Sequence, residues 1–335
     1  MIENCIEFNG SKINFLGVNY LARRVMKHAQ DSEKLIISYL DQNSILIDYE
    51  LKTQFDKFEK KINYEDPRWF INDNKELYCS VVIVNFIEGV GHNTSVGFFK
   101  FSKENKIQKI IIPDFKKNSS SLSPRNIESK KKFPLEKNWQ FFFSEKVLYC
   151  FYVFYPKTIL LKLDKETGRI LKRKSFVYPE TLNYGFVSGG VNPIIKGDMF
   201  FSFFHTFTEY LNRDGEKKRI YHVGAALFEN KFPFYICKIS EKPIYSAIKS
   251  NPSELGDYII FPGSAEFENG KWSIFCGKND NELTLIEIST IDLEENLVQI
   301  SNPVLFDKIK LHIVQFYSTL RRKVLSFYLK IKTIE

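Results

Sequence analysis

The residues best suited to chemistry in this chain are Glu65-Asp66-Pro67-Arg68, which place two carboxylates and one guanidinium within four positions. Because Pro67 fixes its own φ at about −65° and disfavours the helical region for Asp66, we expect this acid to be extended or in a turn at the start of a strand. A rigid acid beside a cation could donate a proton or bind a sugar hydroxyl. The alternative is a surface turn closed by a local Asp66–Arg68 pair.

The composition indicates a sheet-rich protein with a substantial core. Of 335 residues, 44% are hydrophobic and 16% aromatic, with 32 Phe and 17 Tyr, enough for one large domain or two ordinary ones. The 48 Lys and Arg exceed the 40 Asp and Glu, giving a net charge of +8 in short clusters. This charge suits phosphate, a sugar nucleotide or anionic lipid, and we predict no nucleic-acid partner.

The cysteines and the N-terminus bear on the compartment. Five cysteines lie far apart, with no C-x-x-C pair, and predict buried thiols in a reducing environment. The N-terminus lacks the basic start and apolar core of a secretory signal, and no window reaches the roughly 18 apolar residues of a membrane span. We therefore predict a cytoplasmic protein.

Short apolar or alternating runs, bounded by polar residues, predict strands throughout the chain. The predicted strands are Ile45–Asp48, Leu77–Phe86, Ile107–Ile112, Val147–Tyr155, Thr158–Leu163, Met199–Phe204, Ile220–Phe228, Tyr258–Phe261, Trp272–Gly277 and Leu283–Ile288. The predicted hairpin turns are Asn72–Asn74, Asp164–Gly168, Arg213–Lys217 and Glu268–Gly270. One long loop is predicted at Phe115–Lys132, where Lys and Ser are frequent.

The spacing of these features favours a five-bladed β-propeller. Similar punctuation returns about every 50 to 70 residues, with landmarks near Arg24, Asp66, Lys137, Gly190 and Pro262. A β-sandwich would also use such strands, but it would not place a polar landmark at the same phase of each unit. We predict an all-β fold in which residues 1–302 form one propeller with the catalytic site.

Residues 303–335 are predicted to form a basic, amphipathic C-terminal extension with a helix around Ile313–Leu329. This helix could pack against the propeller. It could also bind an anionic membrane surface and hold the protein at the inner face of the membrane.

Several short motifs, taken in chain order, carry a resemblance to a known family. They are Asn9–Ser11, Tyr20–Arg24, Glu65–Arg68, Glu136–Trp139, Gly189–Pro193, Phe204-His205, Tyr221–Ala225, Ile260–Gly263 and Gly277–Asp280. In this order they resemble the five-bladed propellers of glycoside hydrolase family 130, the β-mannoside phosphorylases and hydrolases, and the related β-mannosyltransferases. The resemblance runs from about residue 7 to residue 290.

The resemblance implies an enzyme and a role for each matching residue. Asp66 matches the general acid of an inverting displacement, which can reach the glycosidic oxygen through a hydroxyl of the bound sugar. His205 and Tyr221 match phosphate ligands. The positions that match ligands of the sugar are Arg24 (less closely Arg23), Glu65, Arg68, Lys137, Asn138 and Asp280. The implied partners are an oligosaccharide or glycan, with inorganic phosphate or a sugar-phosphate donor, and no cofactor or metal is expected.

Two departures from the family leave the reaction open. Asn138 stands where an acid is usual, and Tyr184–Ser188 lacks the arginine that phosphorylases carry before the Gly-rich turn at Gly189. Inverting hydrolysis would need a second carboxylate about 6.5 to 9.5 Å from the acid, for which Glu209, Glu229 and Glu266 are candidates. Glycosyl transfer needs no activated water. A propeller that binds carbohydrate without turnover is the alternative from another class.

Other reaction classes lack their motifs in this sequence. It contains no G-x-S-x-G, no G-x-x-x-x-G-K-[ST] and no H-E-x-x-H, and its five histidines are scattered. His222 neighbours Tyr221 in sequence, but we expect it on the opposite strand face and do not predict it as a ligand.

Overall fold

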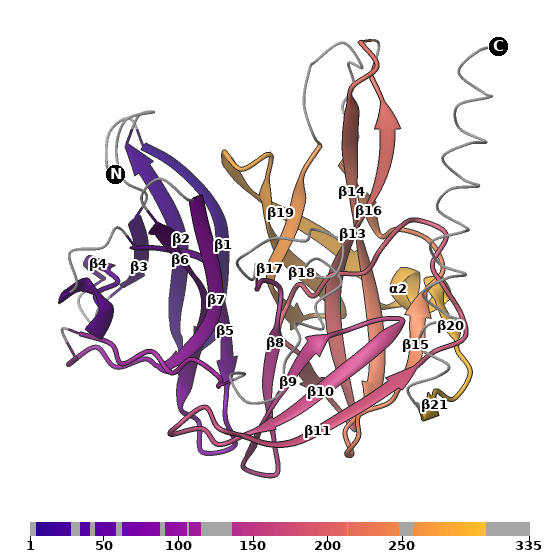
Figure 1. Ribbon diagram of the computed structural model, residues 1–335, viewed down its shortest axis with the longest axis horizontal. Helices are drawn as coiled ribbons and strands as arrows, with labels where there is room; N and C mark the ends of the chain where they lie inside the picture. Colours follow the sequence, from indigo (N-terminus) through magenta and orange to yellow (C-terminus); the bar gives the residue numbers. More distant parts are fainter. Residues whose placement is uncertain are drawn as a thin grey trace.

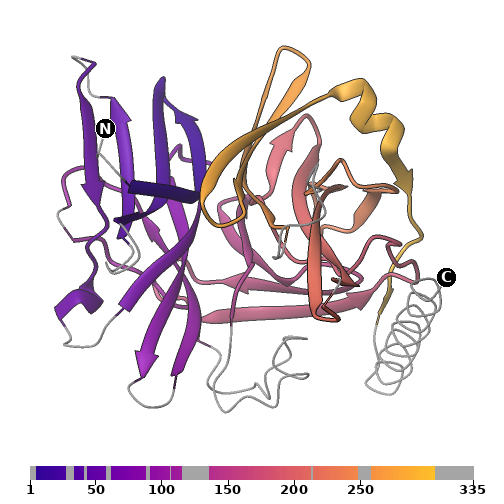
Figure 2. The same cartoon turned by 90° about the horizontal axis from the view of Figure 1, so that it is seen from above.

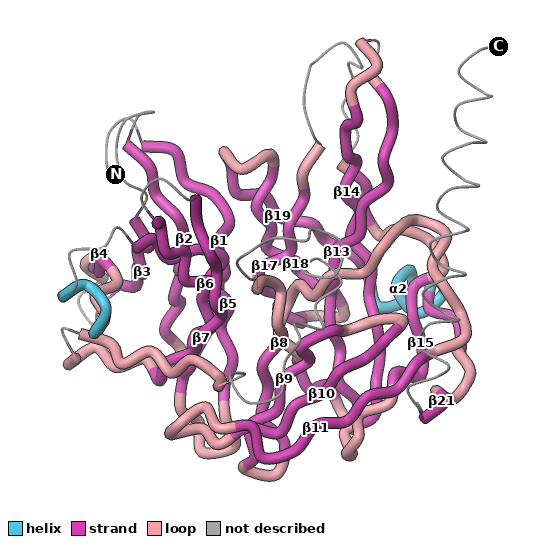
Figure 3. The backbone as a smooth tube through the Cα atoms, in the orientation of Figure 1, coloured by secondary structure: helices cyan, strands magenta, loops and turns pink. Residues whose placement is uncertain are grey.

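The fold of this computed structural model is a five-bladed β-propeller, seen from two directions in Figures 1 and 2. The structure describes residues 5–27, 34–40, 44–57, 62–87, 91–105, 107–114, 136–212, 214–247 and 258–305. The predicted all-β class and propeller are confirmed. Figure 3 shows that strands and loops account for almost all of the described backbone.

The first two blades are antiparallel sheets that follow the order of the chain. Blade 1 contains β1 (Cys5–Phe15), β2 (Val18–Lys27), β3 (Lys34–Leu40) and β4 (Leu46–Glu50). A short 3₁₀ turn, η1 (Gln54–Lys57), leads to blade 2, which contains β5 (Ile62–Ile71), β6 (Leu77–Ile87) and β7 (Gly91–Lys100).

The other three blades complete the ring, and two of them gain strands from the end of the described chain. Blade 3 contains β8 (Gln140–Ser144), β9 (Val147–Val153), β10 (Lys157–Leu163), β11 (Ile170–Val177) and β21 (Val304–Leu305). Blade 4 contains β12 (Ile194–Lys196), β13 (Met199–Leu211), β14 (Lys217–Glu229), β15 (Ile236–Ser240), β16 (Tyr245–Ser246) and β20 (Leu297–Gln299). Blade 5 contains β17 (Ile260–Glu268), β18 (Lys271–Lys278) and β19 (Glu282–Ser289).

Nine of the ten predicted strands are present, and the prediction for Ile107–Ile112 is wrong. This segment makes only isolated bridges, Gln108 with Thr53 and Ile111 with Phe98. The side chain of Gln54 donates to the Ile110 carbonyl at 2.6 Å and accepts from its N–H at 2.9 Å. These bonds take the backbone groups that a neighbouring strand would use.

The C-terminal part of the chain folds back onto earlier blades. One α-helix, α2 (Thr290–Asn296), starts at Ser289, whose hydroxyl accepts from the Asp292 N–H and caps the helix. The first residues of the predicted extension, Val304–Leu305, pair with β11. The predicted loop at Phe115–Lys132 and the predicted helix at Ile313–Leu329 lie outside the described residues. In the described part, no helix is long and apolar enough to cross a membrane.

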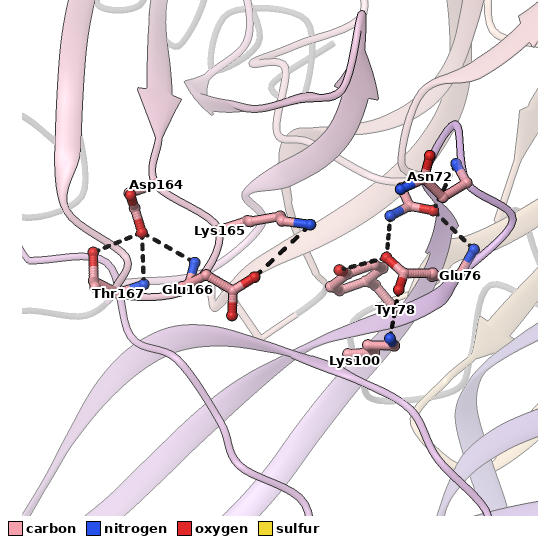
Figure 4. Close-up of polar contacts among 9 residues, drawn as sticks. Asn72, Glu76, Tyr78, Lys100, Asp164, Lys165, Glu166 and Thr167 are labelled. Carbon is pink, nitrogen blue, oxygen red and sulfur yellow. Dashed lines mark hydrogen bonds and ion pairs between the residues drawn. The ribbon is translucent and has the colours of Figure 1, made fainter.

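Two predicted hairpin turns are held by acceptor side chains, as Figure 4 shows. Between β5 and β6, Asn72 Oδ1 accepts from the N–H groups of Asn74 and Glu76 at 3.1 and 2.8 Å. Between β10 and β11, Asp164 Oδ1 accepts from the N–H groups of Glu166 and Thr167 at 3.1 and 2.8 Å. Such bonds replace the backbone partners that strands lose where the chain reverses.

Aromatic packing joins blades 3 and 4. Phe142 of β8 is 1% exposed, and its ring meets Phe200 and Phe234 edge-on, with centroids 5.2 and 4.9 Å away. It stacks on Phe151 at 5.3 Å. Offset and edge-on contacts of this kind add to the free energy gained by burying the rings.

We predict that Phe142→Ala lowers the free energy of unfolding by about 3 to 5 kcal/mol, because the cavity between the blades cannot close fully. Urea unfolding followed by tryptophan fluorescence measures this change. Leu285→Ala on β19 is the control, since Leu285 is 54% exposed and its loss should cost less than about 0.5 kcal/mol. Equal effects of the two variants would contradict the described packing.

Candidate active site

The innermost strands of blades 1 and 2 are irregular near the propeller axis. The pairing register shifts between Phe8 and Ser11 in β1 and between Glu65 and Arg68 in β5. Asn9 and Asp66 sit at these bulges with φ of 45° and 50°. Asn and Asp tolerate this left-handed region better than other residues with a Cβ, and a bulge re-aims the side chains around it.

The predicted setting of Asp66 is therefore wrong in two respects. The acid is neither extended nor at the start of a strand, because it occupies a left-handed position inside β5. Pro67 fits there because the bulge removes the need for a ladder N–H. The alternative of a surface turn is excluded as well, since Asp66 is 8% exposed.

A network of charges surrounds the acid. Arg24 of β2 lies 3.3 Å from Glu65 Oε1 through Nη2 and 3.7 Å from Asp66 Oδ1 through Nη1. Lys137 Nζ lies 2.7 Å from Glu65 Oε2. The two cations thus hold both oxygens of Glu65, and the structure brings together four of the predicted site residues.

The neighbouring charges change the pKa of Lys137. Burial lowers the pKa of Lys137, but the negative charges of Asp66 and Glu65 outweigh it, and the pKa is raised overall. Lys137 therefore stays charged at neutral pH.

Asn9 is a site residue that the sequence prediction missed. Its Nδ2 donates to Asp66 Oδ1 at 3.4 Å and to Asp280 Oδ1 at 2.9 Å, so it links the buried acid to Asp280 in the exposed turn between β18 and β19. The predicted ligand Asp280 is thereby placed at the site. Gly277 allows this approach, because a Cβ there would lie 2.1 Å from Asn9 Oδ1. In the sequence, Asn9 begins the Asn9–Ser11 motif, the first of those that carry the family resemblance.

Arg68 is buried behind the surface of the site. It is 2% exposed and donates to the carbonyl of Trp139 and to Asn138 Oδ1, both at 3.1 Å. A third bond reaches the Gly189 carbonyl at 3.4 Å. Arg68 thus ties blade 2 to blade 3 and to the Gly-rich turn of blade 4, and its guanidinium is held by protein groups.

His205 and Tyr221, the predicted phosphate ligands, lie side by side in blade 4. Their rings stack with centroids 5.8 Å apart, and the His205 ring is 5.0 Å from that of Phe261. The Arg68 guanidinium lies over the same Phe261 ring, 4.8 Å from its centroid. Phe261 therefore lies between His205 and Arg68, and it links the predicted phosphate ligands to the residues around Asp66.

Other candidates lie elsewhere. Arg23, the less close match to the family arginine, contacts Glu7 at 2.9 Å and Asp48 at 3.8 Å within blade 1. Of the three candidates for a second carboxylate, Glu266 pairs with Lys12, and Glu209 pairs with Lys217 and Arg219. Glu229 lies at the end of β14 that is remote from Tyr221. None of these contacts reaches Asp66.

Three further observations complete the site. A small pocket beside the bulge is lined by Asp66, Arg68, Ser80, Val81, Val82, Val96, Asn138 and Trp139. His222, which was not predicted as a ligand, bonds Thr208 and Ser246 through its two ring nitrogens. Among the described residues, no group of three or more His, Cys, Asp or Glu could hold a metal ion.

The comparisons with known proteins rest on structure. No family model matches the sequence, and no curated protein matches it. The fold is similar to β-1,2-mannobiose phosphorylase from Listeria innocua, with a TM-score of 0.55 and 12% identity over 88% of this chain and 94% of that one. Two proteins of Leishmania mexicana are also similar. A mannose phosphorylase in complex with phosphate has a TM-score of 0.58 and 10% identity over 90% and 89% of the two chains. A GDP-Man-dependent mannosyltransferase has a TM-score of 0.57 and 12% identity over 91% and 92%.

The raised pKa of Lys137 predicts how its contribution to stability depends on pH. A cation whose pKa rises on folding stabilises the native state fully below its unfolded pKa, about 10.4, and loses this contribution as pH rises through the folded pKa. We therefore expect the difference in unfolding free energy between the natural chain and Lys137→Gln to stay constant from pH 7 to 9. It should shrink above about pH 10.4. Urea titrations at several pH values across this range measure the difference. A difference that becomes smaller as the pH falls from 9 to 7 would indicate a lowered pKa of Lys137 and would contradict the network.

Proposed function

We propose that this protein is a carbohydrate-active enzyme that makes or breaks a β-mannoside-type glycosidic bond with inversion, by glycosyl transfer or phosphorolysis. The observation that carries the proposal is the cluster of Asp66, Glu65, Arg24 and Lys137 at the axis of the propeller. Carboxylates and cations together suit the dense hydroxyl groups of a sugar, which both donate and accept. The similar structures support the proposal through their fold.

Asp66 is the proposed proton donor, and the contacts separate its role from that of Glu65. Both oxygens of Glu65 are held by cations, whereas Arg24 and Asn9 both contact Oδ1 of Asp66. Within the described residues, Oδ2 of Asp66 is the oxygen left to face a ligand. In bond cleavage the Asp66 carboxyl gives its proton toward the glycosidic oxygen, and in synthesis it takes one from the acceptor hydroxyl.

The other reactant is proposed to bind along His205 and Tyr221. Imidazole N–H and phenol O–H groups can both donate to phosphate oxygens. In phosphorolysis, the phosphate oxygen forms the new bond to the anomeric carbon as the bond to the glycosidic oxygen breaks. In transfer, a sugar donor places its phosphate in the same position, the acceptor hydroxyl oxygen forms the new bond to the anomeric carbon, and the bond to the phosphate oxygen breaks so that the phosphate leaves.

The placement of the acids favours these reactions over hydrolysis, which remains the alternative. Glu209 and Glu266 pair with cations elsewhere, and Glu229 lies at the end of β14 that is remote from Tyr221, so none of them is placed to activate water beside Asp66. A propeller that binds carbohydrate without turnover is the second alternative. Such a protein would bind the same sugars with the same residues, so only a measurement of turnover distinguishes it from the proposed enzyme.

A product screen separates these reactions. The purified protein is incubated with β-linked manno-oligosaccharides with and without inorganic phosphate, and with GDP-mannose or mannose 1-phosphate as donors. Mannose 1-phosphate released only with phosphate would establish phosphorolysis, and chain growth from a donor would establish transfer. Free mannose without phosphate would support hydrolysis, and no turnover in any arm would contradict the proposed enzyme.

We predict that Asp66→Asn lowers turnover in the productive arm by about 10²- to 10⁴-fold, because a general acid contributes a rate gain of this size. Oligosaccharide affinity, measured by calorimetry, should change little, because the amide keeps the shape of the side chain. Asp198→Asn, in the exposed turn between β12 and β13, is the matched control and should keep full activity. A loss below about threefold for Asp66→Asn would contradict its role as the acid.

A further inference from the structure

The two outer strands of blade 3 that carry its long hairpin contain cations and no acids. The cations of β10 and β11 are Lys157, Lys162, Lys172, Arg173 and Lys174, and neither strand contains Asp or Glu. In the part of the chain that the structure describes, none of these five side chains forms an ion pair. A substantial part of the net charge of +8 therefore lies uncompensated on these two strands.

The pairing register gathers three of the lysines on one face. Lys162 lies directly opposite Lys172, and Lys174 follows two residues further along β11. Cross-strand partners and residues two apart share a face, so these side chains project from the same side of the sheet. Lys172 Nζ lies 5.1 Å from the centroid of the Phe232 ring, in the connection between β14 and β15. These three lysines, here called the basic patch, thus lie at the outer rim between blades 3 and 4, and Figure 1 shows β10 and β11 side by side along the lower part of the molecule.

The charges of this hairpin repel one another. Like charges directly opposite on neighbouring strands destabilise a sheet, and Lys162 and Lys172 are such a pair. On the other face of β10, burial and the charge of Arg173 lower the pKa of Lys157. An anionic surface placed against the hairpin would relieve this repulsion.

Protection of an open sheet edge explains only part of the charge. Within the described residues, β21 covers β11 only at Phe176 and Val177, so the rest of β11 is an outer edge. Lysines on such an edge prevent pairing with other chains. This accounts for the cations of β11 but not for Lys162, because β10 is paired on both sides.

Exposed aliphatic side chains beside the cations favour a lipid bilayer as the partner. Leu171, which precedes Lys172, is 45% exposed, and Val304 of β21 is 50% exposed beside the same strand. The boundary between lipid headgroups and acyl chains takes both cations and aliphatic groups. A nucleic acid would use the cations through its phosphates and gain nothing from the aliphatic groups.

The chain continues from this edge into a basic segment. β21 brings the start of residues 306–335 beside β11. Those residues lie outside the described part, and their sequence contains seven Lys or Arg and two Asp or Glu among many apolar residues. Stable attachment to a membrane takes two signals rather than one. We propose that the basic patch, together with Leu171 and Val304, binds the surface of a bilayer that contains anionic phospholipids. This inference does not depend on the proposed function.

Cosedimentation of the full chain with vesicles tests the inference. The vesicles consist of phosphatidylcholine with or without phosphatidylserine, at physiological salt, and a duplex DNA is titrated in parallel. The patch variant is Lys162→Gln/Lys172→Gln/Lys174→Gln, and Leu171→Ser tests the aliphatic contribution. The matched control, Lys34→Gln/Lys242→Gln/Lys271→Gln, removes the same charge from exposed positions on blades 1, 4 and 5. Melting curves and turnover in the productive arm establish that every variant is folded.

We expect the natural chain to bind vesicles that contain phosphatidylserine and not those of phosphatidylcholine alone. The patch variant should weaken this binding by about a hundredfold, because each cation close to an anionic bilayer contributes about fivefold. Leu171→Ser should weaken it by about threefold or more through the lost apolar burial. The control should stay within about twofold, since charges further than a Debye length from the surface are screened.

The inference fails if the natural chain does not bind the anionic vesicles, or if the control weakens binding as much as the patch variant does. It also fails if Leu171→Ser binds like the natural chain while the patch variant loses duplex DNA, which would assign the patch to nucleic acid. Turnover on soluble mannosides is measured separately, so either result leaves the proposed function to be judged by the product screen.

Discussion

The innermost strand of each blade has one edge without a strand partner, and the rest of the molecule depends on how that edge is satisfied. Buried backbone groups need hydrogen bonds, and an unpaired sheet edge presents a row of them. Here side chains from a neighbouring blade supply the partners. Ser11 Oγ accepts from the Trp69 N–H at 3.2 Å, Asn192 Oδ1 from the Phe141 N–H at 2.8 Å, and Ser264 Oγ from the Lys12 N–H at 2.7 Å.

This way of closing the ring also builds the proposed site. A side chain can reach a neighbouring backbone only where the strands come close, and the bulges in β1, β5 and β17 shape that approach. The same bulges place Asn9 and Asp66 in left-handed positions at the axis. Arg68 serves both purposes, because it satisfies carbonyls of two blades while it packs on Phe261 beside His205. Some of the residues that close the ring of blades therefore also form the proposed site.

The sequence predicted the fold well because strand patterns are local. Alternating aromatic residues and polar turns located nine of ten named strands, and Ile107–Ile112 failed where a distant side chain, Gln54, took the backbone groups of Ile110. The site was predicted in part. Arg24 and Lys137 do converge on the acids, but which of Arg23 and Arg24 faces the axis depends on pairing register, which no local pattern fixes. Asn9 was missed because Asn-Gly is also typical of an ordinary turn.

The proposed function depends on the charge cluster around Asp66 holding the sugar at the scissile bond. The most direct measurement is a crystal structure of Asp66→Asn with a β-linked mannobiose. We expect the glycosidic oxygen, or a sugar hydroxyl next to it, to lie within hydrogen-bond distance of residue 66. Sugar hydroxyls should also contact Arg24, Lys137 or Asp280. A mannobiose bound elsewhere on the propeller, with the axis unoccupied at saturating ligand, would contradict the claim.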